Sequence, residues 1–184
     1  MEPTTPPHFA LFDTPLGACG VLWRGDALIG VLLPGDTAVA TRARARRRHA
    51  EATESAPPPF VQAAIARIVA LLNGAHDDLT DLALDMSGIA KFERRVYEAA
   101  RAIAPGCTRT YGELAEQLGE PHAARAVGQA LGANPFAIVV PCHRVLAAHG
   151  RSGGFSAPGG TRTKLRLLEI ERAPLGGSPG LFDA

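Results

Sequence analysis

The chain has 184 residues, 46% of them hydrophobic, and a formal net charge of +1, so it can hold one large or two small domains with a packed core. No apolar run approaches the ~20 residues that span a bilayer, and the N-terminus has neither the basic region nor the apolar segment of a signal peptide. We therefore expect a cytoplasmic protein with no membrane partner.

The two halves of the chain differ in charge. Residues 1–90 contain 7 Lys and Arg against 10 Asp and Glu, whereas residues 91–184 contain 12 against 8. The basic second half is compatible with a nucleic-acid partner, but surface arginines alone do not indicate one.

The first half, residues 1–87, has the pattern of a small α/β domain. Apolar runs separated by the turn sequences DTPLG and RGDA predict three short strands within residues 8–35. Residues 37–59 contain five arginines and no apolar stripe, so we expect either a basic helix or a flexible, solvated segment. An amphipathic helix follows over residues 59–74. The alternating sequence DLTDLALDM, residues 78–86, predicts another strand.

The second half, residues 88–174, is predicted to be mainly helical, with residues 175–184 as a loose tail. A helical stripe over residues 88–104 ends at Pro105-Gly106. Thr110 and Glu113 then form the sequence of a capping box. The short helix that they begin, a four-residue turn and a second short helix have the spacing of a helix-turn-helix. The second helix is rich in Ala and Gly, which permits either close approach to another surface or tight packing in the core.

A cysteine follows the next apolar run. FAIVV, residues 136–140, predicts a buried strand, and PCHRV comes directly after it. Residues 146–161 form a long glycine-rich loop, of a kind that is often functional. The last predicted helix, residues 162–173, would turn Leu165, Leu168 and Ile170 toward the core.

The three cysteines, Cys19, Cys107 and Cys142, occur in no CxxC pair and lack the His spacing of a zinc site. We expect no metal and no disulfide framework. Cys19 is expected to pack as a small apolar residue, and Cys107 to lie in a turn. Cys142 is either a buried thiol beside a surface histidine or a nucleophile.

A nucleophilic thiol needs help near neutral pH, because its pKa is otherwise about 8.5. His143 follows Cys142 directly, and Pro141 indicates that the strand has ended. The two side chains can then turn the same way or share a water molecule. A histidine base in turn needs an orienting group, for which the spacing leaves both Glu169 and Glu171 open.

Four blocks of the second half together resemble the methylated-DNA–protein-cysteine S-methyltransferases, also called O6-alkylguanine-DNA alkyltransferases. They are TYGELA (110–115), AARAVGQALGANP (123–135), PCHRV (141–145) and KLRLLEIE (164–171), in the order and spacing of the family. The match covers about residues 88–172, and residues 1–87 agree only in predicted layout. The resemblance implies an α/β (α+β) fold. Its N-terminal domain would be ribonuclease-H-like with a short antiparallel sheet, and its mainly helical C-terminal domain would contain the helix-turn-helix and the active-site cysteine.

The resemblance implies a DNA repair reaction that each molecule performs once. The protein would bind double-stranded DNA in the minor groove, as a monomer, and flip an O6-alkylguanine, or an O4-alkylthymine, out of the stack. Cys142 would take the alkyl group irreversibly by an SN2 displacement. The reaction requires no metal and no organic cofactor.

The family's site residues carry over to matching positions of this chain. Cys142 would accept the alkyl group, His143 would deprotonate it through a water molecule, and Glu171 would orient His143. Asn134 would brace the turn before the active-site strand. Arg144 would be structural.

The resemblance also implies a set of DNA-binding residues. Tyr111 would lie by the flipped nucleotide, and Arg125 would fill the gap in the stack. Ala124 and Ala126 would let the second helix approach the groove closely. The backbone carbonyls of Cys142 and Val145 would read the guanine amino group. Pro158, which has no N–H, leaves the contact to the guanine oxygen to Ser156 or to another amide.

Other protein classes share only part of this pattern. A helix-turn-helix regulator would carry several base-reading side chains on its second helix, where this chain has only Arg125 and Gln129 beyond His122. A cysteine hydrolase would need an oxyanion hole and leaves the small-residue helix unexplained. Relatives that bind lesions without transfer have tryptophan in place of the cysteine, so Cys142 argues against that alternative.

Overall fold

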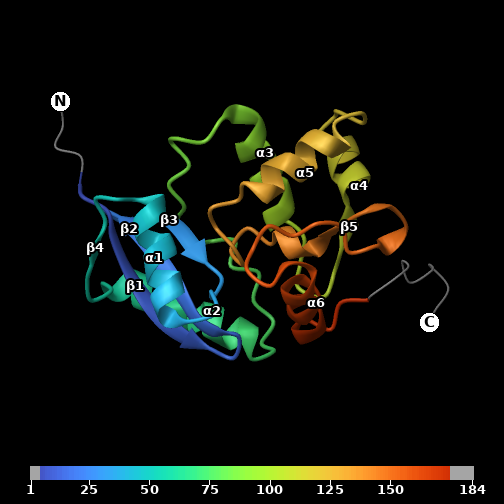
Figure 1. Ribbon diagram of the computed structural model, residues 1–184. Coiled ribbons are helices and arrows are strands. Elements are labelled where there is room, and N and C mark those ends of the chain that lie inside the picture. The colour runs from blue at the N-terminus through green and yellow to red at the C-terminus, as the bar shows by residue number, and fades with distance from the viewer. Residues whose placement is uncertain (1–4, 175–184) are drawn as a thin grey trace.

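The computed structural model describes residues 5–174 and has a mixed α/β fold with a small sheet and six helices (Figure 1). The predicted tail lies outside the described residues. The sheet has the order β3-β2-β1-β4, with β1, β2 and β3 antiparallel and β4 parallel to β1. Its strands are β1 (His8–Thr14), β2 (Gly17–Arg24), β3 (Ala27–Leu32) and β4 (Thr53–Glu54). The three strands predicted within residues 8–35 are confirmed.

Two helices cover the two faces of this sheet, because successive strand residues point to opposite sides. One face, with Phe12 and Val21, packs on α2 (Pro59–Leu72) in the main core. The other face, with Phe9 and Leu22, packs on α1 (Ala38–Arg48), whose Ala45 is fully buried. The amphipathic helix predicted over residues 59–74 is confirmed.

Of the two alternatives for residues 37–59, the structure shows a helix over Ala38–Arg48 only, and residues 49–58 are not helical. Thr37 caps α1 by accepting a 3.1 Å hydrogen bond from the N–H of Ala40. Thr41, fully buried, donates to the carbonyl of Ala18 at 2.9 Å. The face that packs on the sheet consists of Thr41 and Ala45, which is too small and too polar to form a recognisable apolar stripe. With this face on the sheet, Arg44 and Arg48 of α1 donate hydrogen bonds to the backbone carbonyls of Leu33 and Pro135.

The strand predicted at residues 78–86 is wrong. This segment makes only an isolated bridge, between Leu84 and Leu28. The carboxylates of Asp77, Asp78 and Asp85 each accept a hydrogen bond from the backbone N–H two residues later. Such local bonds stabilise turns in place of a sheet ladder.

The second half is mainly helical and packs around the same core. Its elements are α3 (Lys91–Arg101), β5 (Arg109–Thr110), α4 (Tyr111–Gln117), α5 (Ala124–Gly132), η1 (Cys142–Arg144), β6 (Val145–Leu146), η2 (Ala148–Gly150) and α6 (Gly160–Ile170). The capping box is confirmed: Thr110 and Glu113 exchange hydrogen bonds of 3.1 and 2.6 Å at the start of α4. Tyr97 of α3 donates to the carbonyl of Ala130 and joins α3 to α5.

The apolar run at residues 136–140 is buried, but the predicted strand is wrong. Ile138 has a φ of 74°, and the run forms only isolated bridges. Periodicity cannot separate a short buried strand from another buried conformation. The run instead lies along the edge strand β3 and bonds to it. The N–H of Val31 donates to the carbonyl of Pro135 at 2.9 Å, and the N–H of Ala137 donates to the carbonyl of Val31 at 3.1 Å. The first half of the chain thus supports the segment that leads to Cys142.

The core face of α6 differs from the prediction. Leu168 is buried as expected, but Leu165 is 38% exposed and Ile170 is half-buried. The buried positions are Lys164, Leu167 and Leu168, which share one helical face. No helix in residues 5–174 is long and apolar enough to cross a membrane.

Candidate active site

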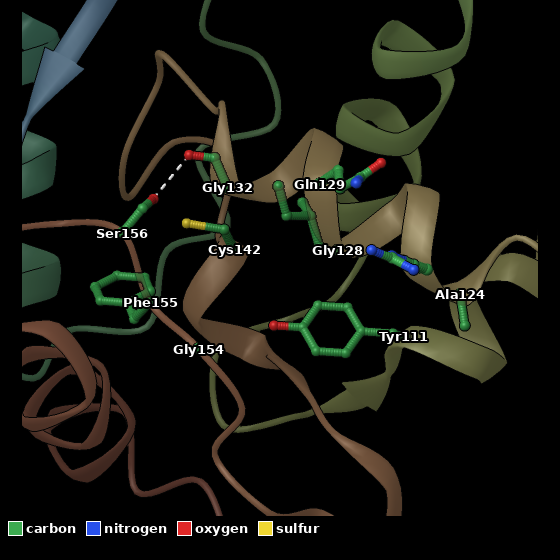
Figure 2. Close-up of a pocket in the computed structure, with 11 residues that line it drawn as sticks. Tyr111, Ala124, Gly128, Gln129, Gly132, Cys142, Gly154, Phe155 and Ser156 are labelled. Atoms are coloured by element: carbon green, nitrogen blue, oxygen red, sulfur yellow. Dashed lines mark hydrogen bonds between the residues drawn. The ribbon is translucent and has the colours of Figure 1, made fainter.

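Cys142 begins a single 3-10 turn, η1, immediately after Pro141. The amide of Cys142 donates to Val140 at 2.8 Å, and that of Arg144 donates to Pro141 at 2.9 Å. The chain therefore turns at the cysteine, as Pro141 indicated. Cys142 is partly exposed and lines a cavity of about 580 Å³ (Figure 2). Its walls are Tyr111, Ala124, Arg125, Gly128, Gln129, Leu131, Gly132, Gly154, Phe155 and Ser156.

His143 points into the protein and bonds to Glu171. Its side chain is 1% exposed, and its Nε2 lies 2.9 Å from Oε1 of Glu171, at the C-terminal end of α6. Glu169, the other candidate, is exposed and pairs with Arg166 at 2.7 Å. The geometry therefore selects Glu171. The Nδ1 atom of His143 is buried and has no hydrogen-bond partner among residues 5–174.

Arg144 shares the same carboxylate. Its guanidinium donates to both oxygens of Glu171, at 2.9 and 2.8 Å, and to the carbonyl of Ile103. Burial alone would raise the pKa of Glu171, but the hydrogen bonds from His143 and Arg144 outweigh it and lower that pKa to about 2. Arg144 is 1% exposed, and the bidentate pair compensates its buried charge.

These charges determine the state of His143. An ionised Glu171 only accepts hydrogen bonds, so Nε2 of His143 carries the proton. Burial lowers the pKa of His143, against the opposing effect of Glu171. The imidazole is therefore neutral, and its Nδ1 carries a free lone pair. A neutral histidine held in this tautomer is suited to act as a base.

The surroundings of Cys142 act on the thiol in opposite directions. Burial raises its pKa, whereas a hydrogen bond from Asn134 and the charge of Lys164 lower it. Asn134 is itself fixed: its amide donates to Val140 at 2.8 Å and accepts from the N–H of Phe136 at 2.8 Å. These two hydrogen bonds join Asn134 to the residues on either side of the turn before Cys142.

Lys164 is a site residue that the sequence analysis missed. It is fully buried, and its Nζ donates to the carbonyl of Val145 at 2.6 Å. The same Nζ lies 5.7 Å from the ring centre of Tyr111 and 5.9 Å from that of Phe155. Burial lowers its pKa to about 8. The sequence did contain a signal for this position. Lys164 lies three residues before Leu167 and four before Leu168, and this spacing puts the lysine on the same helical face as two core leucines.

The walls of the cavity come from Tyr111 at the start of α4, from α5 and from the glycine-rich loop (Figure 2). Arg125 is exposed on α5. Ser156 donates to the carbonyl of Gly132 at 2.7 Å and ties the loop to the end of α5. A Cβ on Gly153, whose φ is 65°, would lie 3.2 Å from the ring of Tyr111, so the loop approaches this ring only through a glycine.

The structure thus gathers most of the predicted site residues. Cys142, Tyr111, Arg125, Ala124 and Ser156 line the cavity. Asn134, His143 and Glu171 stand behind the thiol. Ala126 and Val145 do not line the cavity, and the carbonyl of Val145 already accepts a hydrogen bond from Lys164.

Comparison with known proteins agrees with this geometry. Residues 91–173 match the model of the 6-O-methylguanine DNA methyltransferase, DNA binding domain. A methylated-DNA–protein-cysteine methyltransferase of Mycobacterium tuberculosis is 36% identical over 177 residues, 96% of this chain and 99% of the relative. The corresponding protein of Methanothermobacter thermautotrophicus is 32% identical, over 89% of this chain and 84% of its own length.

The chain belongs to the methylated-DNA–protein-cysteine methyltransferase family.

Solved structures of this family share the fold along most of the chain. The M. tuberculosis OGT in complex with DNA is 37% identical, with a TM-score of 0.73, and the match covers 91% of this chain and 95% of that chain. The O6-methylguanine-DNA methyltransferase of Pyrococcus kodakaraensis is 29% identical, with a TM-score of 0.70, and the match covers 89% and 98%. The likeness extends into the first half of the chain, where no sequence motif had identified the family.

Replacing Lys164 by methionine is expected to shift thiol reactivity in this methyltransferase to higher pH. The substitution removes the positive charge that lowers the pKa of Cys142 and keeps an apolar stem of similar length. The rate of Cys142 alkylation by iodoacetamide, measured by mass spectrometry across pH, reports this change. Arg166→Met removes an exposed charge from the same helix and should leave the profile in place. An unchanged profile in Lys164→Met would show that its charge does not reach the thiol.

Proposed function

We propose that this chain repairs DNA by moving an alkyl group, in the first place methyl, from O6 of guanine to Sγ of Cys142, once per molecule. The observation that carries the proposal is the pairing of an accessible thiol with a buried histidine–carboxylate pair. Cys142 faces an open cavity, while His143 and Glu171 lie 2.9 Å apart behind it. The OGT of M. tuberculosis, which shares this fold, is known in complex with DNA.

The transfer is a single displacement. His143 takes the proton of Cys142 through a bridging water molecule, with the free lone pair of Nδ1 as the acceptor. The thiolate attacks the alkyl carbon: the S–C bond forms, the C–O6 bond breaks, and the electron pair leaves on O6. The proton returns to the guanine, which becomes a normal neutral base. The thioether does not revert, so the protein is consumed.

His143 is well placed to hold the proton for a short time. Glu171 stabilises the imidazolium that forms, and Arg144 keeps Glu171 ionised. Asn134 and Lys164 stabilise the thiolate. All of these groups are preorganised in the protein, so little rearrangement accompanies the reaction.

DNA would bind across α4 and α5 as a helix-turn-helix, from the minor-groove side. Ala124, Ala126 and Gly128 let the backbone of α5 come close to the groove, and Arg125 projects from it into solvent. A flipped guanine would enter the cavity beside Tyr111, whose ring lines the wall next to Cys142. Flipping an altered base costs a few kcal/mol, and the cost is least where pairing is already weak.

The first half of the chain would act as a ribonuclease-H-like domain that supports the site. The protein would work as a monomer in the cytoplasm.

The test is to incubate the protein with a duplex that carries labelled O6-methylguanine. One label per protein molecule should appear, on the peptide that contains Cys142, and the DNA should regain guanine. Label on Cys19 or Cys107, or more than one turnover per molecule, would contradict the proposal.

Arg125→Ala is expected to slow transfer from duplex DNA about tenfold, which corresponds to the loss of a stacking contact of 1–2 kcal/mol. The arginine would occupy the gap that the flipped base leaves, so reaction with the free base O6-methylguanine should change much less. Single-turnover rates on both substrates make the comparison. Arg94→Ala removes an exposed arginine outside the cavity and serves as the control for charge. Equal losses on duplex and free base in Arg125→Ala would rule out this role.

A further inference from the structure

A second cavity adjoins the first at Cys142 and shares Leu131, Gly132, Phe155 and Ser156 with it. It has a volume of about 140 Å³, nearly five times the ~30 Å³ share of a water molecule in the liquid. Its walls are Val31, Leu32, Leu33, Arg44, Arg48, Leu131, Gly132, Asn134, Ala137, Phe155, Ser156 and Ala157. Cys142 lines both cavities. Figure 2 shows its Sγ directed toward Ser156, which also lines both cavities, and away from Tyr111. A group bonded to the sulfur therefore has the second cavity within reach as well as the first.

Two arginines of α1 make this cavity positive. Arg44 and Arg48 are four residues apart and therefore lie on the same face of the helix. Arg44 donates to the carbonyl of Leu33 at 2.7 Å, and Arg48 donates to the carbonyl of Pro135 at 3.1 Å. Each bond fixes one N–H of a guanidinium that has five donors.

Neither arginine has an acidic partner within residues 5–174, although Arg42 and Arg46 on the same helix both reach Glu54. Burial, and then the neighbouring charge of Arg48, lowers the pKa of Arg44. Arg44 is half-buried and Arg48 is exposed, and two neighbouring like charges without an anion repel each other. The two arginines are also preorganised to bind a ligand that carries a negative charge, because a guanidinium binds a carboxylate through paired N–H groups.

We propose that this cavity receives the group being transferred and favours alkyl groups that end in a carboxylate. The inference rests on the proposed function and adds a preference among its substrates. For a carboxymethyl group, the Sγ–CH2 bond forms as the CH2–O6 bond breaks, and the electron pair leaves on O6. The carboxylate takes no part in bond making; it meets Arg44 and Arg48 while the carbon is in line with the sulfur.

Three substrates in the same duplex test the proposal: O6-carboxymethylguanine, its uncharged amide O6-carbamoylmethylguanine, and O6-methylguanine. In the double variant Arg44→Met/Arg48→Met, the ratio of the carboxymethyl rate to the carbamoylmethyl rate should fall about tenfold, as expected when charge-assisted hydrogen bonds are lost. Arg47→Met removes the exposed arginine next to Arg48, outside the cavity, and should leave the ratio as it is. The single variants report which arginine dominates.

The outcomes separate this inference from the proposed function. If the double variant slows all three substrates equally, the arginines contact the DNA backbone and the proposal is overturned. If the wild-type protein transfers methyl but the carboxymethyl-to-carbamoylmethyl ratio does not depend on Arg44 and Arg48, only the preference is wrong. If no alkyl group is transferred, the proposed function itself fails.

A second experiment uses the protein without DNA. Iodoacetate and iodoacetamide place a charged or a neutral group of the same size on a thiol, with loss of iodide. The ratio of the two rates at Cys142, divided by the same ratio at the exposed Cys107, should be higher in the wild type than in the double variant. Equal values in the two proteins would overturn the proposal even if DNA repair is normal.

Discussion

Cys142→Ser is expected to abolish alkyl transfer completely while leaving the affinity for duplex DNA within about twofold. A hydroxyl is a far weaker nucleophile than a thiolate, and the His143–Glu171 pair gives it too little help to displace an alkyl group from guanine. The side chain is partly exposed and nearly the same size, so the fold should tolerate the change. Labelled transfer and a mobility-shift titration measure the two properties separately.

The matched control is Cys107→Ser, which alters an exposed thiol in the same half of the chain. This variant should accept one alkyl group per molecule at the wild-type rate. Cys19 is fully buried and burial raises its pKa to about 11, so it should stay unlabelled in every variant. Residual transfer in Cys142→Ser would mean that another residue accepts the group.

Glu171→Gln is expected to lower the free energy of unfolding by about 3–5 kcal/mol and to stop efficient transfer. The carboxylate is 4% exposed and neutralises Arg144, so the amide leaves a buried guanidinium without its counter-ion. It also removes the group that keeps the proton of His143 on Nε2. Chemical denaturation at pH 7 measures the first effect, and single-turnover transfer measures the second.

Stability should also depend on pH through Glu171. Its pKa is about 2 in the folded protein, below the ordinary value of 4.5, so its contribution is complete above about pH 5 and is lost as the pH falls toward 2. Protonation of Glu171 should lower the free energy of unfolding by about 3 kcal/mol over that pH range. In Glu171→Gln the stability should fall less steeply in the same window. Parallel curves for the two proteins would contradict the low pKa.

The double variant Arg144→Met/Glu171→Gln separates stability from chemistry. Without the buried cation the amide no longer leaves a charge uncompensated, so much of the lost stability should return. Transfer should not return, because His143 still lacks its carboxylate. Recovery of transfer in the double variant would show that Glu171 acts only on the fold.

Features that depend on neighbouring residues were predictable from the sequence. The capping box of Thr110 and Glu113 and the apolar stripe of α2 were both correct, because each is formed within a few turns of one helix. The blocks around Cys142 identified the family before any fold was known. α1 and residues 78–86 were harder, because a face of Thr41 and Ala45 carries little hydrophobic signal and local aspartate bonds replaced the expected strand.

Features that depend on which distant segments meet were decided by the tertiary structure. The residues alone left Glu169 and Glu171 equally possible; the end of α6 turns Glu171 toward His143 and leaves Glu169 in solvent. Lys164 became part of the site because the face of α6 that carries it packs under β6. Arg44 and Arg48 line a cavity together with Cys142 because α1 lies on the sheet whose edge strand, β3, bonds to residues 135–137. Periodicity describes a helix face but not the surface that the face will meet. The cysteine proposed as the nucleophile could therefore be located from the sequence, whereas most of the residues around it could not.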